Sequence, residues 1–172
     1  MHRGADGAAG DVGHTQVTVE DVSEAPACRC GNSGCVEAYA GGWALVRDLR
    51  EAGRDVATVN DAVRLIRGGD LVAVRLARRA ARILGGAIAD TVNLFNPRVI
   101  AIGGQLAHTD EQLFAGIREI VYRRSLPLAT RNLQIARSDL DPHAGILGLA
   151  QLLVDGIYTP ERVQELIDGA VV

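Results

Sequence analysis

All three cysteines of this 172-residue chain, Cys28, Cys30 and Cys35, fall within one stretch of eight residues. A histidine, His14, precedes them at a Gly-His pair. Three thiolates and one imidazole nitrogen form a ligand set typical of a tetrahedral structural zinc site. We therefore predict a zinc loop over residues 14–37, with His14, Cys28, Cys30 and Cys35 as the ligands. Three sulfur ligands and one nitrogen leave no open position for a catalytic water, so the predicted ion is structural.

The cysteines have two other interpretations, reduced core thiols and a disulfide. Reduced core thiols would lie at helix or strand spacing among apolar neighbours, whereas these alternate with the polar and glycine residues Arg29, Gly31 and 32–34. A disulfide is disfavoured by the odd number of cysteines and by the lack of a recognisable secretory segment. The same features indicate a reducing, cytoplasmic environment.

The composition of the chain argues against two kinds of partner, nucleic acids and membranes. The net charge is -3 and the sequence pI is about 5.8, so no global basic field favours binding to nucleic acid. No apolar run is long enough for a membrane span, and we expect no membrane partner. With 48% hydrophobic but only 3% aromatic residues, the core must consist mainly of small aliphatic side chains. The length suits one packed domain.

The elements that must position the loop can be predicted from the pattern of apolar residues. Residues 1–13 lack periodicity and predict a loop, and the alternation over 14–19 predicts a strand. After the cysteines, apolar residues at steps of three and four predict a helix from Val36 to about Ala52, which Gly53 ends. Thr58 followed by Asp61 resembles a capping box that begins a short helix.

The second part of the chain predicts helices around a small sheet. Asp70 can cap the longest helix, which runs to about Phe95 and contains a Gly85-Gly86 pair that indicates close approach of another backbone or a ligand. A buried strand over 98–102 then leads into Gly103-Gly104. The remaining expectations are a strand over 132–136 and helices over 110–123, 143–155 and 160–168. This pattern predicts a helix-rich α/β fold in a single domain.

Four motifs, in this order, resemble those of the ROK family, a name that covers repressors, open reading frames and sugar kinases. They are the segment from Gly7 to His14, the run from Cys28 to Glu37, the pair Asn93–Pro97 and Ile100–Gly104, and the segment Ala144–Gly148. The resemblance implies the carboxyl-terminal half of an actin-like, sugar-kinase ATPase fold built on ribonuclease-H-like domains. The chain is then one ROK-type sugar-binding fragment over residues 1–172.

The resemblance also implies roles for three residues. His14 would bind zinc through one ring nitrogen and offer the other to a sugar hydroxyl, while Glu37 and Asp11 would contact sugar hydroxyls. The family usually has Glu where this chain has Asp11, and the carboxylate is withdrawn by one methylene. Because hydrogen bonds tolerate only small changes in distance, sugar affinity or identity would differ. From the residues alone, Asp11 is interpreted as a solvated acidic residue in a loop, and Glu37 as an acidic residue in the first turn of a helix.

Parts that the family's kinases need for phosphoryl transfer are not found in this sequence. An Asp-x-Gly-Gly-Thr phosphate loop, an Asn-Asp pair before the zinc loop and a Gly-Thr-Gly-x-Gly turn are all lacking. Asn60-Asp61 does spell the catalytic pair, but it follows the zinc loop and is explained by helix-start chemistry. Gly103 and Gly104 would border a nucleotide, although Gln105 replaces a third glycine. We assign no catalytic residue and do not expect this chain alone to be an enzyme.

Two functions follow from the resemblance. The first is the zinc-stabilised sugar-binding effector domain of a ROK-type transcriptional regulator, which would reach DNA only through an additional N-terminal domain. The alternative is the carboxyl-terminal part of a zinc-containing sugar kinase that phosphorylates a hexose or N-acetylhexosamine, and only then would ATP be a cofactor. Either parent is expected to be a homo-oligomer, a dimer or a tetramer.

Overall fold

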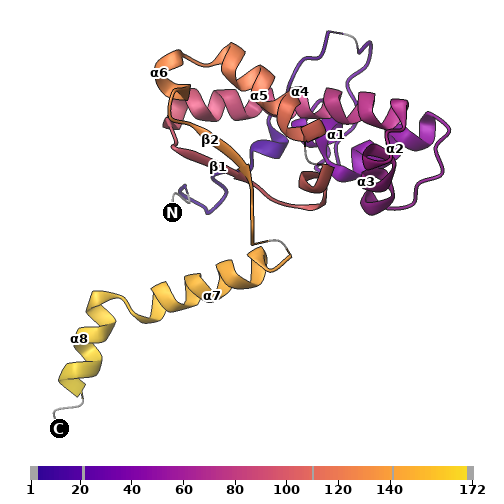
Figure 1. The fold of residues 1–172 in the computed structure, drawn as a ribbon. Helices are drawn as coiled ribbons and strands as arrows, with labels where there is room; N and C mark the ends of the chain where they lie inside the picture. The colour runs from indigo at the N-terminus through magenta and orange to yellow at the C-terminus, as the bar shows by residue number, and fades with distance from the viewer. Residues whose placement is uncertain (1–3, 21, 110, 141, 170–172) are drawn as a thin grey trace. The chain divides into compact units, whose positions relative to one another are not determined.

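The computed structural model describes residues 4–20, 22–109, 111–140 and 142–169, and it divides the chain into two compact units, 1–137 and 138–172 (Figure 1). Among its described residues, the first unit holds the cysteine loop, six α-helices and a parallel pair of strands. The second unit holds two further helices. The helix-rich fold with a small sheet agrees with the prediction from sequence.

The predicted strand over 14–19 is wrong. In its place, η1 (Val12–His14) forms a turn of 3-10 helix, and a single antiparallel bridge then joins Gln16 to Cys35. The Val17 backbone N–H donates to the Gly34 carbonyl at 2.8 Å, so this segment pairs with the cysteine loop. The pairing is limited to this isolated bridge, so the alternating pattern does not become a strand.

The helix predicted over 36–52 is two helices, α1 (Val36–Ala40) and α2 (Gly42–Glu51). They are separated at Gly41, whose ψ of 154° is extended rather than helical. Two successive glycines have low helix propensity, so the chain can turn there at little cost. The predicted end is confirmed, because Gly53 adopts a left-handed φ of +76°.

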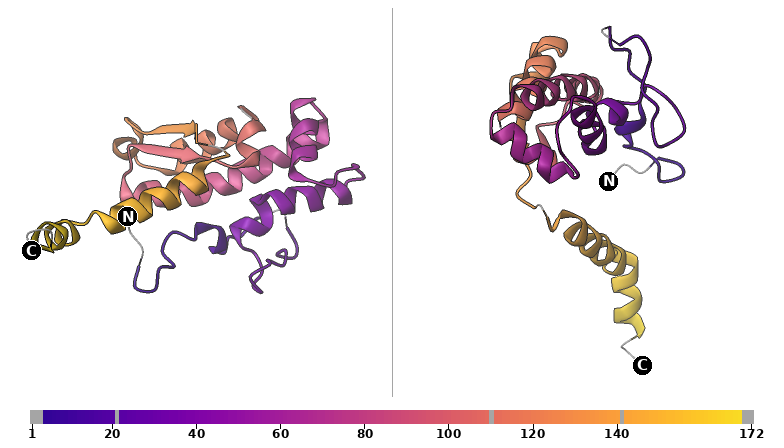
Figure 2. Two further views of the ribbon diagram at one scale, coloured as in Figure 1. Left: turned by 90° about the horizontal axis from the view of Figure 1, so that it is seen from below. Right: turned by 90° about the vertical axis from the view of Figure 1, so that its right-hand side faces the viewer.

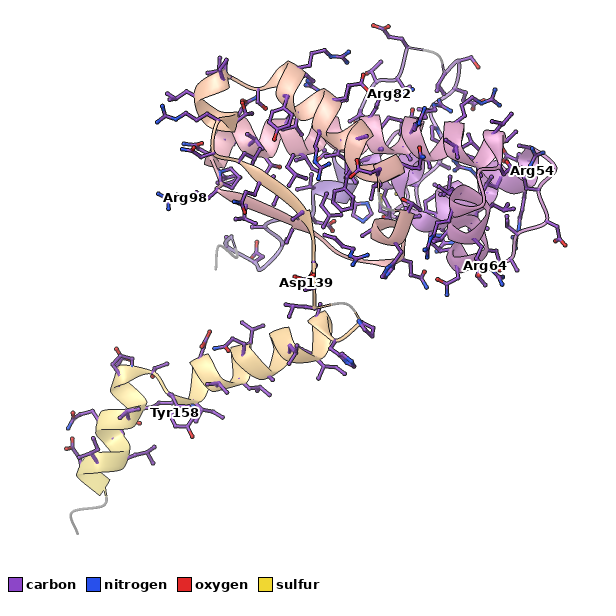
Figure 3. All side chains as sticks on the ribbon, viewed as in Figure 1. Arg54, Arg64, Arg82, Arg98, Asp139 and Tyr158 are labelled. Carbon is purple, nitrogen blue, oxygen red and sulfur yellow. The ribbon has the colours of Figure 1, made fainter. Side chains whose placement is uncertain are left out.

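The two predicted helix starts that follow are confirmed. Thr58 and Asp61 form a complete capping box at the start of α3 (Val59–Arg67). At the start of α4 (Leu71–Phe95), the Asp70 carboxylate accepts hydrogen bonds from the second and third backbone N–H groups. Arg54, labelled in Figure 3, donates to the other oxygen of Asp70 at 2.9 Å and ties the end of α2 to α4.

The first unit has one core between α4, α5 (Glu111–Arg124) and the sheet, and a second core among α2, α3 and α4. Strands β1 (Val99–Ile102) and β2 (Gln134–Arg137) are parallel, connected through η2 (Gln105–Thr109), α5 and the short α6 (Pro127–Thr130). Helix α5 lies alongside α4 (Figure 2). At Gly85 a Cβ would lie 3.0 Å from the Ile117 carbonyl oxygen, so the predicted close approach is that of the α5 backbone.

The second unit consists of α7 (Ala144–Ile157) and α8 (Pro160–Gly169). Both helices agree with the predicted segments. No described residue of either helix is buried, although α7 is rich in Leu and Ile. Among the described residues, no helix has the length and apolar character that crossing a membrane requires.

Candidate functional site

The four predicted ligands lie together. One donor atom from each of His14, Cys28, Cys30 and Cys35 can be chosen so that all four are within 4.8 Å of one another. The Cys28 Sγ is 3.7 Å from the His14 Nδ1, and the Cys30 Sγ is 3.8 Å from the Cys35 Sγ. All three cysteines are free thiols. This cluster could hold a metal ion.

A tight backbone turn over residues 28–32 helps to bring the three cysteine sulfurs close together. The Cys28 N–H donates to the Asn32 carbonyl at 2.7 Å, and the Gly31 N–H donates back to the Cys28 carbonyl at 3.1 Å. Gly31 and Gly34 have φ values of +96° and +73°. Other residues rarely adopt this left-handed region, so the two glycines are what allows the loop to close.

The three thiols differ in environment. Cys28 and Cys35 are buried, whereas Cys30 is exposed. The Asn32 backbone N–H lowers the pKa of Cys30 by hydrogen bonding to its sulfur, and burial raises the pKa of Cys35 to about 12. A metal cation beside the Cys35 sulfur would oppose this effect of burial, because a thiol that coordinates a metal is deprotonated.

Asp11 and Glu37, the predicted sugar contacts, flank the His14 ring on its two nitrogens. The Glu37 Oε2 is 3.6 Å from Nδ1, and the Asp11 Oδ2 is 3.8 Å from Nε2. Both separations exceed a hydrogen bond. Since Nδ1 is the nitrogen that faces Cys28, Nε2 remains available on the side of Asp11. His14 and Glu37 have side chains about one-third exposed, at 35% and 36%.

One residue beside this site was missed from sequence. The Trp43 Nε1–H donates a 2.8 Å hydrogen bond to the Glu37 Oε1. In one continuous helix, residues six apart point about 120° away from each other. The predicted helix over 36–52 therefore concealed the contact, and only the interruption at Gly41 could have signalled it.

The other candidate positions lie elsewhere in the first unit. Gly103 and Gly104 come directly after β1, and Gly104 has a φ of +88° with nothing within 4 Å of where a Cβ would be. Asp61 is engaged in the capping box of α3, as the helix-start explanation of Asn60-Asp61 requires. Hydrogen bonds from the Thr58 backbone, reinforced by Arg64, hold the pKa of Asp61 well below its usual range.

Comparison with known proteins agrees with the motifs. The model of the ROK family matches residues 1–155. The chain belongs to the ROK family. Its ROK relatives include the xylose repressor of Caldicellulosiruptor bescii, 30% identical over 94% of the chain and 43% of that protein. They also include the glucokinase of Thermotoga maritima, 32% identical over 90% of the chain and 52% of that protein.

Solved ROK structures show the same fold. A glucokinase from Streptomyces griseus in complex with glucose and AMPPNP matches with a TM-score of 0.72 at 30% identity, over 88% of this chain and 53% of that one. A transcriptional regulator described as a homologue of the E. coli MLC protein matches with a TM-score of 0.68 at 30% identity, over 79% and 36%. The actin-like fold class is therefore established, and the chain spans about half the length of the curated relatives it matches.

Proposed function

We propose that this chain is a zinc-stabilised, sugar-binding effector domain of a ROK-type transcriptional regulator. The observation that carries the proposal is the position of His14, whose ring lies close both to the three cysteines and to the carboxylates of Asp11 and Glu37. Nδ1 faces Cys28 and Glu37 and is placed to ligate a metal, while Nε2 lies beside the Asp11 carboxylate, on a side that suits a sugar hydroxyl. We propose residues 1–172 as one such fragment, with the metal loop over 14–37.

The cluster fits zinc. Two sulfurs that each lie about 2.3 Å from an ion at a tetrahedral angle are separated by about 3.8 Å. The Cys30–Cys35 separation of 3.8 Å and the Cys28–His14 separation of 3.7 Å match the edges of such a tetrahedron. A bound zinc would supply the positive charge that keeps the thiolates ionised and would fix the loop. Coordination through Nδ1 would hold the His14 ring at the ion, with Nε2 directed away from it.

We assign sugar recognition to the outward Nε2 of His14, to Asp11 beside it, and to Glu37, whose carboxylate lies at the Nδ1 edge of the same ring. Asp11 is exposed at 67% of its side-chain area, and it can move to accept a hydroxyl hydrogen. Glu37 is half-buried and its Oε2 faces the His14 ring, so both can contact neighbouring hydroxyls of one sugar. A hydroxyl both donates and accepts, and it therefore suits a pairing of carboxylates with an imidazole.

The regulator branch is supported by relatives named as repressors, among them the xylose repressor that matches across nearly the whole chain. In such a parent, sugar binding would bias closure of the domain and alter the spacing of DNA-binding heads in a homo-oligomer. We further propose a cytoplasmic, dimeric or tetrameric parent.

A sugar kinase is the second candidate. The glucokinase relative is as similar as the repressor, and the Streptomyces griseus glucokinase structure holds glucose with AMPPNP. Gly103 and Gly104 would then border the ATP, because the carboxyl end of a strand with an open glycine turn lets phosphates approach the backbone. Gln105 in place of a third glycine weighs against tight nucleotide binding.

The first experiment measures metal content by elemental mass spectrometry on the reduced chain, together with calorimetric titration of glucose, N-acetylglucosamine, N-acetylmannosamine and xylose. We expect one zinc per chain and binding of one of these sugars. Cys30→Ser should abolish zinc binding, whereas the matched control Ser33→Ala in the same loop should retain it. Full metal content in Cys30→Ser would refute the ligand assignment. A zinc-loaded chain that binds none of the four sugars would refute the sugar site.

The two parents are distinguished by the coding sequence upstream of this segment in its gene. A basic helix-turn-helix there would establish the regulator, and an Asp-x-Gly-Gly-Thr loop followed by an Asn-Asp pair would establish the kinase.

A further inference from the structure

Trp43 is the only tryptophan of the chain, and two arginine side chains lie over its indole ring. The guanidinium of Arg29 lies 4.7 Å from the ring centroid, and that of Arg47 lies 5.4 Å from it. Arg47 is itself anchored, since it donates to the Ala38 carbonyl at 3.0 Å. Cations over an aromatic face attract the ring electrostatically. Of the two cationic groups in contact with the ring, Arg29 comes from the metal loop and Arg47 from α2, the helix that carries Trp43.

The indole also packs against the cysteine cluster. Trp43 is partly buried against Cys28, Cys35 and Ala38. Arg29 stands between two of the predicted metal ligands, Cys28 and Cys30, so its contact with the indole connects the loop to the start of α2. A change in the loop is therefore transmitted to the indole through a direct contact.

The backbone between the two helices creates the contact with Glu37. At Gly41, a Cβ would lie 2.6 Å from the Glu37 carbonyl oxygen and 3.3 Å from the Trp43 Nε1. A side chain there would force the two helices apart, so Gly41 is the residue that permits Trp43 to return over Glu37. The resulting N–H···O bond measures 2.8 Å and satisfies the indole N–H, which is the only donor of a tryptophan side chain.

Glu37 needs such a partner. Its Oε2 faces the His14 ring at 3.6 Å, and no hydrogen bond from that ring holds the carboxylate in place. The Trp43 N–H engages the other oxygen, Oε1, which leaves Oε2 directed at the space beside His14. A carboxylate fixed through one oxygen loses less rotamer freedom when the other binds a ligand.

We propose that Trp43 is a positioning residue for the Glu37 carboxylate: the indole N–H holds one oxygen so that the other is preorganised for a sugar hydroxyl. This inference rests on the proposed function for its sugar, but the Trp43–Glu37 hydrogen bond stands apart from it. Arg29 and Arg47 orient the indole N–H, and Arg29 is itself part of the metal loop.

The hydrogen bond is tested first, by nuclear magnetic resonance. Because the chain has one tryptophan, a ¹⁵N-labelled sample gives one indole N–H resonance. We expect that resonance to lie downfield and to exchange slowly with water, and to move upfield with faster exchange in Glu37→Ala. An indole resonance that Glu37→Ala leaves unchanged would overturn the proposal, whatever the chain binds.

The effect on ligand binding is tested next, with the zinc-loaded full chain and the same four sugars. Trp43→Phe keeps an aromatic ring near the two arginines and removes the N–H donor together with part of the indole ring system. We expect roughly two- to tenfold weaker sugar affinity in Trp43→Phe with zinc content unchanged, because the Glu37 carboxylate must then be immobilised when the sugar binds. The matched control Tyr39→Phe, which removes a polar atom from α1, should bind as the wild type does.

The outcomes separate the two proposals. Wild-type affinity in Trp43→Phe would overturn the positioning role, and so would an equal loss in Tyr39→Phe, which would mark a general packing effect. If the wild-type chain binds none of the sugars, the proposed function fails. The indole resonance then decides alone whether Trp43 orients Glu37.

Discussion

Substituting Gly116 by alanine should destabilise the first unit by forcing α4 and α5 apart. A Cβ at Gly116 would lie 2.7 Å from the Ala81 Cβ and 3.4 Å from the Arg78 carbonyl oxygen. Neither neighbour can rotate away, because one is a methyl group fixed to the helix and the other is backbone. The helices themselves must therefore separate along the interface that forms the core.

The size of the effect is a difference between two opposing terms. Overpacking a tight core costs about 1 to 3 kcal/mol. Replacing glycine by alanine inside a helix returns about 1 kcal/mol of helix propensity. A net loss of about 1 kcal/mol is expected, and in a domain of this size it lowers Tm by about 2 to 4 °C. Urea unfolding followed by far-ultraviolet circular dichroism measures the loss.

A neighbouring glycine provides the matched control. At Gly86, a Cβ would meet only the Arg124 guanidinium, the far end of a flexible side chain. Gly86→Ala should therefore keep the propensity gain and stabilise the chain. Ala81→Gly should also cost less in the Gly116→Ala background than in the wild type, since it removes the clashing methyl. A Gly116→Ala variant as stable as Gly86→Ala would refute the packing argument.

Three further predictions concern stability. Thr58→Ala removes the cap of α3 and should cost about 1 kcal/mol in urea unfolding, whereas Thr18→Ala at an exposed site should change little. Leu49→Ala empties a fully buried position on α2 and should cost about 2 to 5 kcal/mol; a loss below 1 kcal/mol would contradict its place in the core. The pKa of Asp61 is depressed in the folded chain, so its contribution is present above the ordinary value of 3.8 and is lost as pH falls below it. The urea midpoint should therefore drop between pH 7 and pH 3 by less in Asp61→Asn than in the wild type, and equal drops would exclude this carboxylate as a cause.

Local chemistry determined much of this protein from its sequence. The capping box of Thr58 and Asp61, the cap at Asp70 and the end of α4 near Asn96 each depend on residues within one turn of each other. The gathering of three cysteines in a glycine-containing loop is likewise a short-range property. Such features can be predicted because the interacting groups are already neighbours along the chain.

Only the tertiary structure decided the features that depend on contacts between residues far apart in the sequence. The segment over 14–19 pairs with the cysteine loop instead of a strand, and no local pattern reveals the partner. The close approach at Gly85 was predictable, but its partner, Ile117, lies on another helix. The extended backbone at Gly41 brings Trp43 onto Glu37 and against the cysteine loop, contacts that the periodicity of one continuous helix does not reveal.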